Sequence, residues 1–242
     1  MLPLHFRRPW LNAPGTLGFA PDSRGPLDLD QLGAFVTNPI SLRPRKAARP
    51  PRLQQLAGVI WLHTGHPNPG IRRVLDRYRA AWVRAPLPIV PHLLANQPDE
   101  IARMVAPLEG LENVEAIEVG IPPDAAPELA RALVAAAVGE RPVVAHIGLE
   151  RIHELAASAM QAGASAVSLG APRLANADGQ ERRVYGRQVL EQALAATRQL
   201  VAASIPTIAA GGIFSPADGQ SLLDAGALAV QIDLALWTKW DW

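Results

Sequence analysis

The sequence predicts a single (β/α)8 TIM barrel, class α/β, that occupies residues 1–242 as one domain. Eight short apolar runs alternate with helical patterns along the chain, which is the order expected for a parallel barrel. The runs are unbroken rather than alternately polar and apolar, as in strands that are buried on both faces. With 242 residues and 49% apolar composition, the chain is long enough for one barrel and its core.

The elements follow in order. A short N-terminal lead-in, residues 1–31, is expected to be irregular or a hairpin, because residues 13–19 are rich in turn formers. The predicted strands are 32–37, 57–63, 88–94, 114–121, 142–147, 164–169, 206–210 and 228–232. The predicted helices are 71–82, 99–108, 126–138, 151–162 and 186–203, and a further helix begins after the N-cap Ser215. The proline- and arginine-rich segment 37–54 is expected to be a loop.

The chain ends soon after its last predicted strand, with LALWTKWDW. The eighth helix of the barrel is therefore expected to be truncated or absent. Trp237, Trp240 and Trp242 are candidates to cover the surface that this helix would protect. The alternative is a second subunit, as in a homodimer.

Composition restricts the partners. A formal net charge of +1 gives no indication of nucleic acid or an anionic membrane as a partner. The absence of cysteine excludes disulfides, thiolate metal sites and thiol catalysis. No apolar run approaches a membrane span, and the first residues lack a signal-peptide core, so we expect a cytoplasmic protein. The 23 basic residues comprise 21 arginines and only Lys46 and Lys239.

One stretch, residues 205–233, reads as a strand, a tight turn, a helix and a second parallel strand. Gly211 and Gly212 follow the first of these strands directly. Adjacent glycines there let backbone N–H groups approach a ligand, and the following helix start adds donors and a positive dipole end, which suits a phosphate. A tight turn before a helix also needs glycine without any ligand. Both interpretations remain open on spacing alone.

Four motifs, in order and in register over nearly the whole chain, resemble the dihydroorotate dehydrogenase family. They are LNAPGTLGFAPD, DLDQLGAFVTNPISLRPRKAARPPRL, LHTGHPNPGI and IPTIAAGGIFSPADGQSLLDAGALAVQIDLAL. The resemblance implies a flavoprotein oxidoreductase barrel with FMN lying across the carboxyl ends of the strands. It also implies that the phosphate rests on the loops after the seventh and eighth strands.

Specific residues follow from the resemblance. Those that match positions near the cofactor are Ala13, Pro14, Gly15, Gly120, Gly186, Gly211, Gly212, Asp233 and Leu234. Those that match positions with catalytic or flavin-contacting roles are Asn38, His63 and His146.

Several of these positions depart from the family pattern. Asn38 and His146 stand where the family carries lysines beside the flavin, and His63 and Gly120 stand where asparagines are expected. The loop with the catalytic cysteine or serine is essentially missing. Asp233 replaces a glycine, and a carboxylate there would repel a phosphate unless it points away or is protonated. Dihydroorotate oxidation itself is therefore not expected.

A second constellation consists of His63, His92 and His146, near the ends of predicted strands two, three and five, with Glu118 on strand four. If all four point inward, they provide ligands for a divalent ion, or a general acid and base. Each histidine can equally be a core or loop residue with a local hydrogen bond. We therefore assign no metal ligand.

Three functions remain as hypotheses. The first is a divergent member of the family that binds FMN or a related phosphorylated ligand and oxidises another substrate. The second is a non-redox barrel that uses the histidines for metal or acid–base chemistry on a phosphorylated small molecule. The third is a catalytically silent member that acts through a partner.

Overall fold

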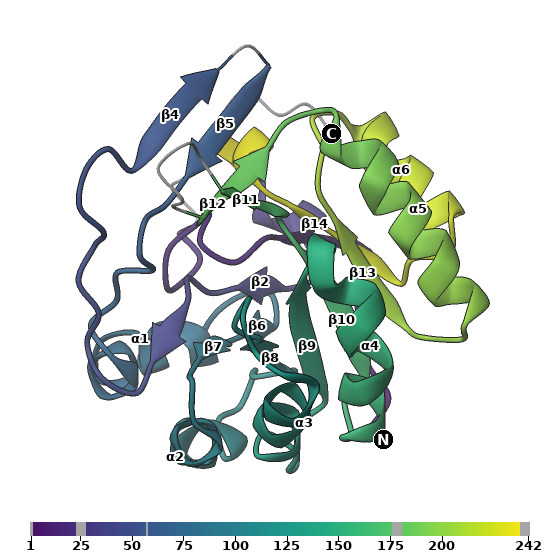
Figure 1. Cartoon of the computed structure of the whole chain (residues 1–242). Coiled ribbons are helices and arrows are strands. Elements are labelled where there is room, and N and C mark those ends of the chain that lie inside the picture. The colour runs from purple at the N-terminus through teal and green to yellow at the C-terminus, as the bar shows by residue number, and fades with distance from the viewer. Residues whose placement is uncertain (1, 23–27, 57, 176–180, 238–242) are drawn as a thin grey trace.

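A computed structural model describes residues 2–22, 28–56, 58–175 and 181–237. It confirms the (β/α)8 barrel: parallel strands curl into a closed ring with helices outside it (Figure 1). Hydrogen bonding runs in the order β1-β14-β13-β10-β9-β8-β7-β3, while β2 pairs with β6. A bridge between Leu11 and Ala34 joins β1 to β2 and closes the ring.

The barrel has eight strand positions, which we call staves. They are formed by ten strands, because two staves are interrupted. They are β1 (Trp10–Asn12), β2 with β3 (Phe35–Val36 and Ile40–Ser41), β6 with β7 (Ile89–Val90 and His92–Leu94), β8 (Ile117–Gly120), β9 (Val143–Gly148), β10 (Ala166–Gly170), β13 (Thr207–Ala210) and β14 (Ala229–Ile232).

Six α-helices lie outside the ring in the described part of the chain. They are α1 (Ile71–Val83), α2 (Pro98–Glu109), α3 (Pro127–Ala135), α4 (Ile152–Gln161), α5 (Val189–Ala202) and α6 (Pro216–Asp224). Ser215 caps α6 as predicted, since its side chain accepts the N–H of Asp218. The short 3-10 turns η1 (Leu29–Gln31), η2 (Leu149–Arg151) and η3 (Leu234–Trp237) complete the chain. The described part of the last helix is therefore only η3, and no described helix has the length and apolar character to cross a bilayer.

Two predictions about the staves were wrong in detail. The lead-in is not merely irregular, because β1 pairs in parallel with β14 and forms a stave. The predicted strand 57–63 does form β5 (Val59–Leu62), but β5 lies outside the barrel. It belongs to an antiparallel sheet with β4 (Leu53–Leu56), β12 (Glu181–Tyr185) and β11 (Arg173–Ala175). Antiparallel pairing leaves β5 only partly buried, and its apolar run does not reveal that.

The barrel interior is built in layers. An apolar layer takes one or two residues from each stave, namely Leu11, Ala34, Val36, Val90, Ala116, Val144, Ala166, Ile208 and Ala229. Leu4 and Phe6 from the lead-in pack against it. Alternate residues of a strand point to the same face, so the residues two positions further on also point inward. They form a second layer nearer the carboxyl ends of the strands, and this layer is largely polar.

Candidate functional site at the barrel mouth

Three adjoining pockets open at the carboxyl ends of the staves, below the antiparallel sheet. We call them the arginine pocket (about 180 Å³), the imidazole pocket (about 70 Å³) and the lead-in pocket (about 130 Å³). His66 and Arg183 line all three. The active site of a TIM barrel lies at this end. The mouth is therefore the candidate site of this chain.

Glu118 is the centre of the polar layer. It is 1% exposed, and its carboxylate accepts three hydrogen bonds. His92 Nδ1 lies 2.7 Å from Oε2, while Ser168 Oγ (2.7 Å) and Gln231 Nε2 (2.8 Å) both donate to Oε1. Burial alone raises the pKa of Glu118, but the facing His146 and the hydrogen bond from His92 outweigh burial, and the pKa lies at about 2. The carboxylate is therefore ionised at neutral pH.

This network fixes the state of His146. The Nδ1 atom of His146 lies 3.0 Å from Ser168 Oγ. The single proton of Ser168 is already donated to Glu118, so the hydroxyl accepts from His146, and Nδ1 must carry the imidazole proton. The Nε2 atom then bears a lone pair. Burial lowers the pKa of His146 to about 4, although the Glu118 carboxylate works in the opposite direction. The imidazole is thus neutral at pH 7.

His92 sits beside His146 in the same layer. Their rings meet edge to face with centroids 5.0 Å apart. Gly120 makes room for this ring, because a Cβ atom at Gly120 would lie 2.8 Å from His92 Nε2 and 2.5 Å from Leu94 Cδ2. Gly120, which we predicted to approach a cofactor, therefore has a packing role towards an imidazole.

The pair of imidazoles and Glu118 also form the candidate cation site among the described residues. One ligand atom from each of the three lies within 4.8 Å of the others. An ion between Glu118 and His92 would have to break their hydrogen bond of 2.7 Å. An ion bound by the Nε2 atoms would instead leave Glu118 outside its ligand set, as a carboxylate that orients a histidine ligand. This arrangement is common in zinc sites. Two imidazoles alone provide fewer than the four ligands of a structural zinc site or the three of a catalytic one.

His63 does not join this cluster. It follows β5, outside the ring, and its side chain is exposed at the rim of the arginine pocket. Of the four side chains whose convergence the sequence left open, His92, His146 and Glu118 come together and His63 does not. The physical reason is the position of β5, which never enters the barrel.

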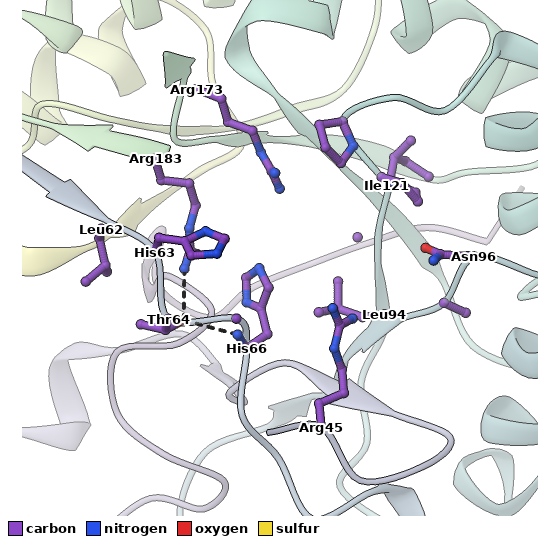
Figure 2. Close-up of a pocket in the computed structure, with 15 residues that line it drawn as sticks. Arg45, Leu62, His63, Thr64, His66, Leu94, Asn96, Ile121, Arg173 and Arg183 are labelled. Carbon is purple, nitrogen blue, oxygen red and sulfur yellow. Dashed lines mark hydrogen bonds between the residues drawn. The ribbon is translucent and has the colours of Figure 1, made fainter. Parts of the chain in front are cut away.

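His66 takes the position that the sequence suggested for His63. Gly65 and His66 both have positive φ, 74° and 52°, and this turn brings the His66 ring back into the mouth (Figure 2). Burial, followed by the charge of Arg183, lowers the pKa of His66 to about 2. The sequence did contain a signal, a histidine after glycine in HTGHPNPG, but it does not show which way the turn folds.

The tight turn at Gly211 and Gly212, which the sequence suggested as a phosphate site, is present. Gly211 and Gly212 have φ of 107° and 73°, a region that favours glycine. Gly212 also packs closely, since a Cβ atom there would lie 2.3 Å from the backbone nitrogen of Leu190. At Gly186 a Cβ would lie 2.7 Å from the carbonyl oxygen of Gly58. All three glycines are therefore required by the fold, whether or not a ligand binds.

One donor near this turn and one at the turn after β14 are bound by carboxyl groups of the chain itself. The N–H of Phe214 donates to Asp218 Oδ2 at 2.9 Å, and the N–H of Leu234 donates to Asp233 Oδ1 at 2.6 Å. Arg187 lies 3.5 Å from Asp218 Oδ2. Asp233 lines the imidazole pocket together with Gly211. A phosphate at the N–H groups of Phe214 and Leu234 would have to displace these two carboxyl groups, so these two positions fit the phosphate of FMN poorly.

The remaining predicted residues lie at the edge of the mouth. Ala13 and Pro14 line the imidazole and lead-in pockets, and Gly15 and Asn38 line the lead-in pocket. Asn38 is held to Gly18, whose N–H donates to Asn38 Oδ1 at 3.1 Å. It therefore anchors the loop that follows β1. Trp237 donates its indole N–H to the carbonyl of Thr16, while Trp240 and Trp242 lie outside the described residues.

The fold and the mouth define a class, a parallel barrel whose polar residues gather at the carboxyl ends of its strands. No profile of a known protein family matches the chain. Curated relatives do match: the catalytic subunit of dihydroorotate dehydrogenase B (NAD(+)) from Desulforudis audaxviator is 30% identical over 257 residues, covering 96% of this chain and 84% of the relative. The same subunit from Trichlorobacter lovleyi is 29% identical over 260 residues, with the same coverage.

The chain therefore belongs to the dihydroorotate dehydrogenase family. Among solved structures, the Eimeria tenella dihydroorotate dehydrogenase in complex with ferulenol superposes with a TM-score of 0.72. At 15% identity, and with 92% of this chain and 74% of that one covered, this likeness concerns the fold. The family was predicted from the motifs, and the fold from the alternation of apolar runs and helical patterns.

Proposed function

We propose that this protein catalyses proton transfer on a small molecule at the barrel mouth, with His146 as the general base. The observation that carries the proposal is the hydrogen-bond chain from Glu118 through Ser168 to His146 Nδ1, with distances of 2.7 and 3.0 Å. This chain leaves Nε2 as the basic atom of a neutral ring. The side chain is 20% exposed, and it lines the imidazole pocket.

The surroundings of His146 partly compensate the charge that a base acquires during the reaction. A proton taken from a substrate turns the ring into an imidazolium, and Glu118 Oε1 lies 3.8 Å from its Nδ1 atom. A fixed, buried carboxylate at that distance offsets part of the cost of burying this charge, without reorganising solvent. Since Nδ1 is already bonded to Ser168, the ring does not need to turn during the transfer.

The test uses heavy water, because the substrate is unidentified. Pools of small hydroxy-, keto- and dicarboxylates are incubated with the protein in D₂O, and proton NMR reports which carbon-bound hydrogens are replaced by deuterium. Exchange at one carbon is expected with the wild type. His146→Gln should lower its rate by about 100-fold or more, the usual contribution of a general base. Ser168→Ala, which removes only the orienting hydroxyl, should have a smaller effect.

The control is His153→Gln, on the exposed face of α4. Exchange that is unchanged in His146→Gln would refute the assignment of the base. The pH profile provides a second criterion: the rate should rise through pH about 4, where His146 loses its proton, and then stay level.

An FMN-dependent oxidoreductase is the second candidate, and it is favoured by family membership together with the retained turn at Gly211 and Gly212. The two candidates are separated by the visible spectrum of the purified protein, before and after addition of excess FMN and desalting. A retained flavin spectrum would favour the oxidoreductase. A colourless protein that still exchanges hydrogen would favour proton transfer without flavin.

A further inference from the structure

We propose that the arginine pocket binds a small metabolite with two negative charges, either a dicarboxylate or a phosphate monoester, through Arg45, Arg173 and Arg183. This inference rests on the proposed proton transfer in one respect, because it names the class of substrate for the same mouth. The affinity for the anion is nevertheless measurable without any turnover.

The geometry brings the three guanidinium groups together from separate segments. Arg173 is on β11 and Arg183 on β12, and the antiparallel register pairs these two residues directly. Both side chains extend from the sheet into the pocket, while Arg45 reaches it from the opposite side (Figure 2). Arg45 belongs to an exposed loop, but its backbone is tied to Asn68 by hydrogen bonds of 2.9 and 3.1 Å. Its position is thus fixed.

The register places the two arginines opposite each other at the pocket. An anion bound between them is attracted by both positive charges, and a guanidinium matches a carboxylate or phosphate with two parallel hydrogen bonds. Arg183 already donates to Thr64 Oγ1 at 3.3 Å, which orients it within the pocket.

The positive charge is local. The whole chain has a formal net charge of only +1. Nevertheless, none of the described residues that line the arginine pocket carries a carboxylate. The carboxylates of the mouth, Glu150 and Asp233, line the adjoining imidazole pocket. The arginine pocket is therefore the part of the mouth where an anion is favoured.

The volume leaves room for a small anion. A pocket of about 180 Å³ accommodates a metabolite of a few carbon atoms. Gly120 and Leu94 line both the arginine pocket and the imidazole pocket. An anion held by the arginines therefore lies next to the pocket that contains His146.

The experiment measures anion binding by isothermal titration calorimetry at low ionic strength. The probes are succinate, glycerol phosphate and inorganic phosphate, with acetate as the singly charged comparison. Saturable binding of a dianion is expected, with weaker binding of acetate. Succinate and glycerol phosphate distinguish the two sources of the charge.

Arg173→Gln and Arg183→Gln should each weaken the preferred dianion about tenfold or more, as expected when a charged hydrogen-bond partner is lost. Arg45→Gln lies in an exposed loop and tests the same point if a strand variant fails to fold. Arg198→Gln, on the exposed face of α5, is the matched control and should bind like the wild type.

The outcomes separate this inference from the proposed function. Absence of saturable binding, or equal affinity in the pocket variants and Arg198→Gln, would overturn the anion site even if hydrogen exchange occurs. Anion binding that persists in His146→Gln, together with absence of exchange in the wild type, would support the anion site and refute the proton transfer.

Discussion

Replacing Asp233 by asparagine should change how the stability of this protein depends on pH. The Asp233 side chain is 6% exposed and lies where the family resemblance puts the cofactor phosphate. Burial raises its pKa from 3.8 to about 7, although the backbone N–H of Leu234 partly offsets this effect. Asparagine has nearly the same shape, keeps an oxygen for that N–H, and never ionises.

The magnitude follows from the two pKa values. The unfolded chain releases the proton near pH 3.8 and the folded chain near pH 7, so between these values the folded state binds more protons. Stability then falls as pH rises, and the loss is complete above pH 7. Three pH units at about 1.4 kcal/mol each give about 4 kcal/mol for the wild type. Asp233→Asn has no ionisable group at this position, so its stability should not fall for this reason.

The assay is urea unfolding of the wild type and Asp233→Asn at several values between pH 3.5 and 8.5. The unfolding free energy of Asp233→Asn minus that of the wild type should increase as pH rises through this window and then level off. Glu118 and His146 titrate in both proteins, so their contributions cancel in the difference. Asp124→Asn, at an exposed position, is the control and should give a flat difference. A difference that does not change with pH for Asp233→Asn would refute the raised pKa of this buried carboxyl group.

Three further changes test the structure around the mouth. Gly212→Ala should destabilise the protein by about 3 kcal/mol in thermal unfolding, because φ is positive and the added Cβ would meet Leu190. Gly18→Ala, which also has a positive φ but open space around it, should cost only about 1 kcal/mol in the same measurement. Glu118→Gln should cost about 3 kcal/mol in urea unfolding at pH 7, because an amide nitrogen would face buried donors; a loss below about 1 kcal/mol would contradict the network. Ser168→Ala should shift the nitrogen NMR signals of the His146 ring towards a tautomer mixture, and unchanged signals would argue against the assigned proton.

A charged substitution at Gly212 is less informative than a change at Asp233. Gly212→Glu would place a carboxylate at the turn where the sequence suggests a phosphate. The structure puts Leu190 nitrogen within 2.3 Å of any Cβ at this position, so the substitution would also disturb the junction with α5. Asp233→Asn is easier to interpret, because it alters the charge of the side chain with little change in its shape.

Much of the fold was predictable because its strands are buried on both faces. Strands such as β9 and β10 read as mainly apolar runs, and a capping signal such as Ser215 marks the start of a helix. The errors occurred where this rule fails. The stave β1 has three residues and ends in Asn12, so its apolar run is too short to recognise. The apolar run of β5 instead covers the outside of the mouth.

The site was only partly predictable for a related reason. His92, Glu118 and His146 lie on regular strands, and the period of two fixes the face to which each one points. His66 and Arg173 depend on turns and on a sheet formed by segments distant in sequence. Their orientation follows from the φ of one residue and from a register that the sequence does not display.

The distribution of charge around the mouth shows which side of it favours an anion. At the turns after β13 and β14, the N–H groups of Phe214 and Leu234 already donate to Asp218 and Asp233. On the opposite side, Arg173 and Arg183 line the arginine pocket, which adjoins the imidazole pocket that His146 lines. An anionic ligand thus meets two occupied donors on one side and is attracted to the other. A substrate bound by the arginines would reach His146 from the side of the antiparallel sheet, and it would need no contact with the glycine turn.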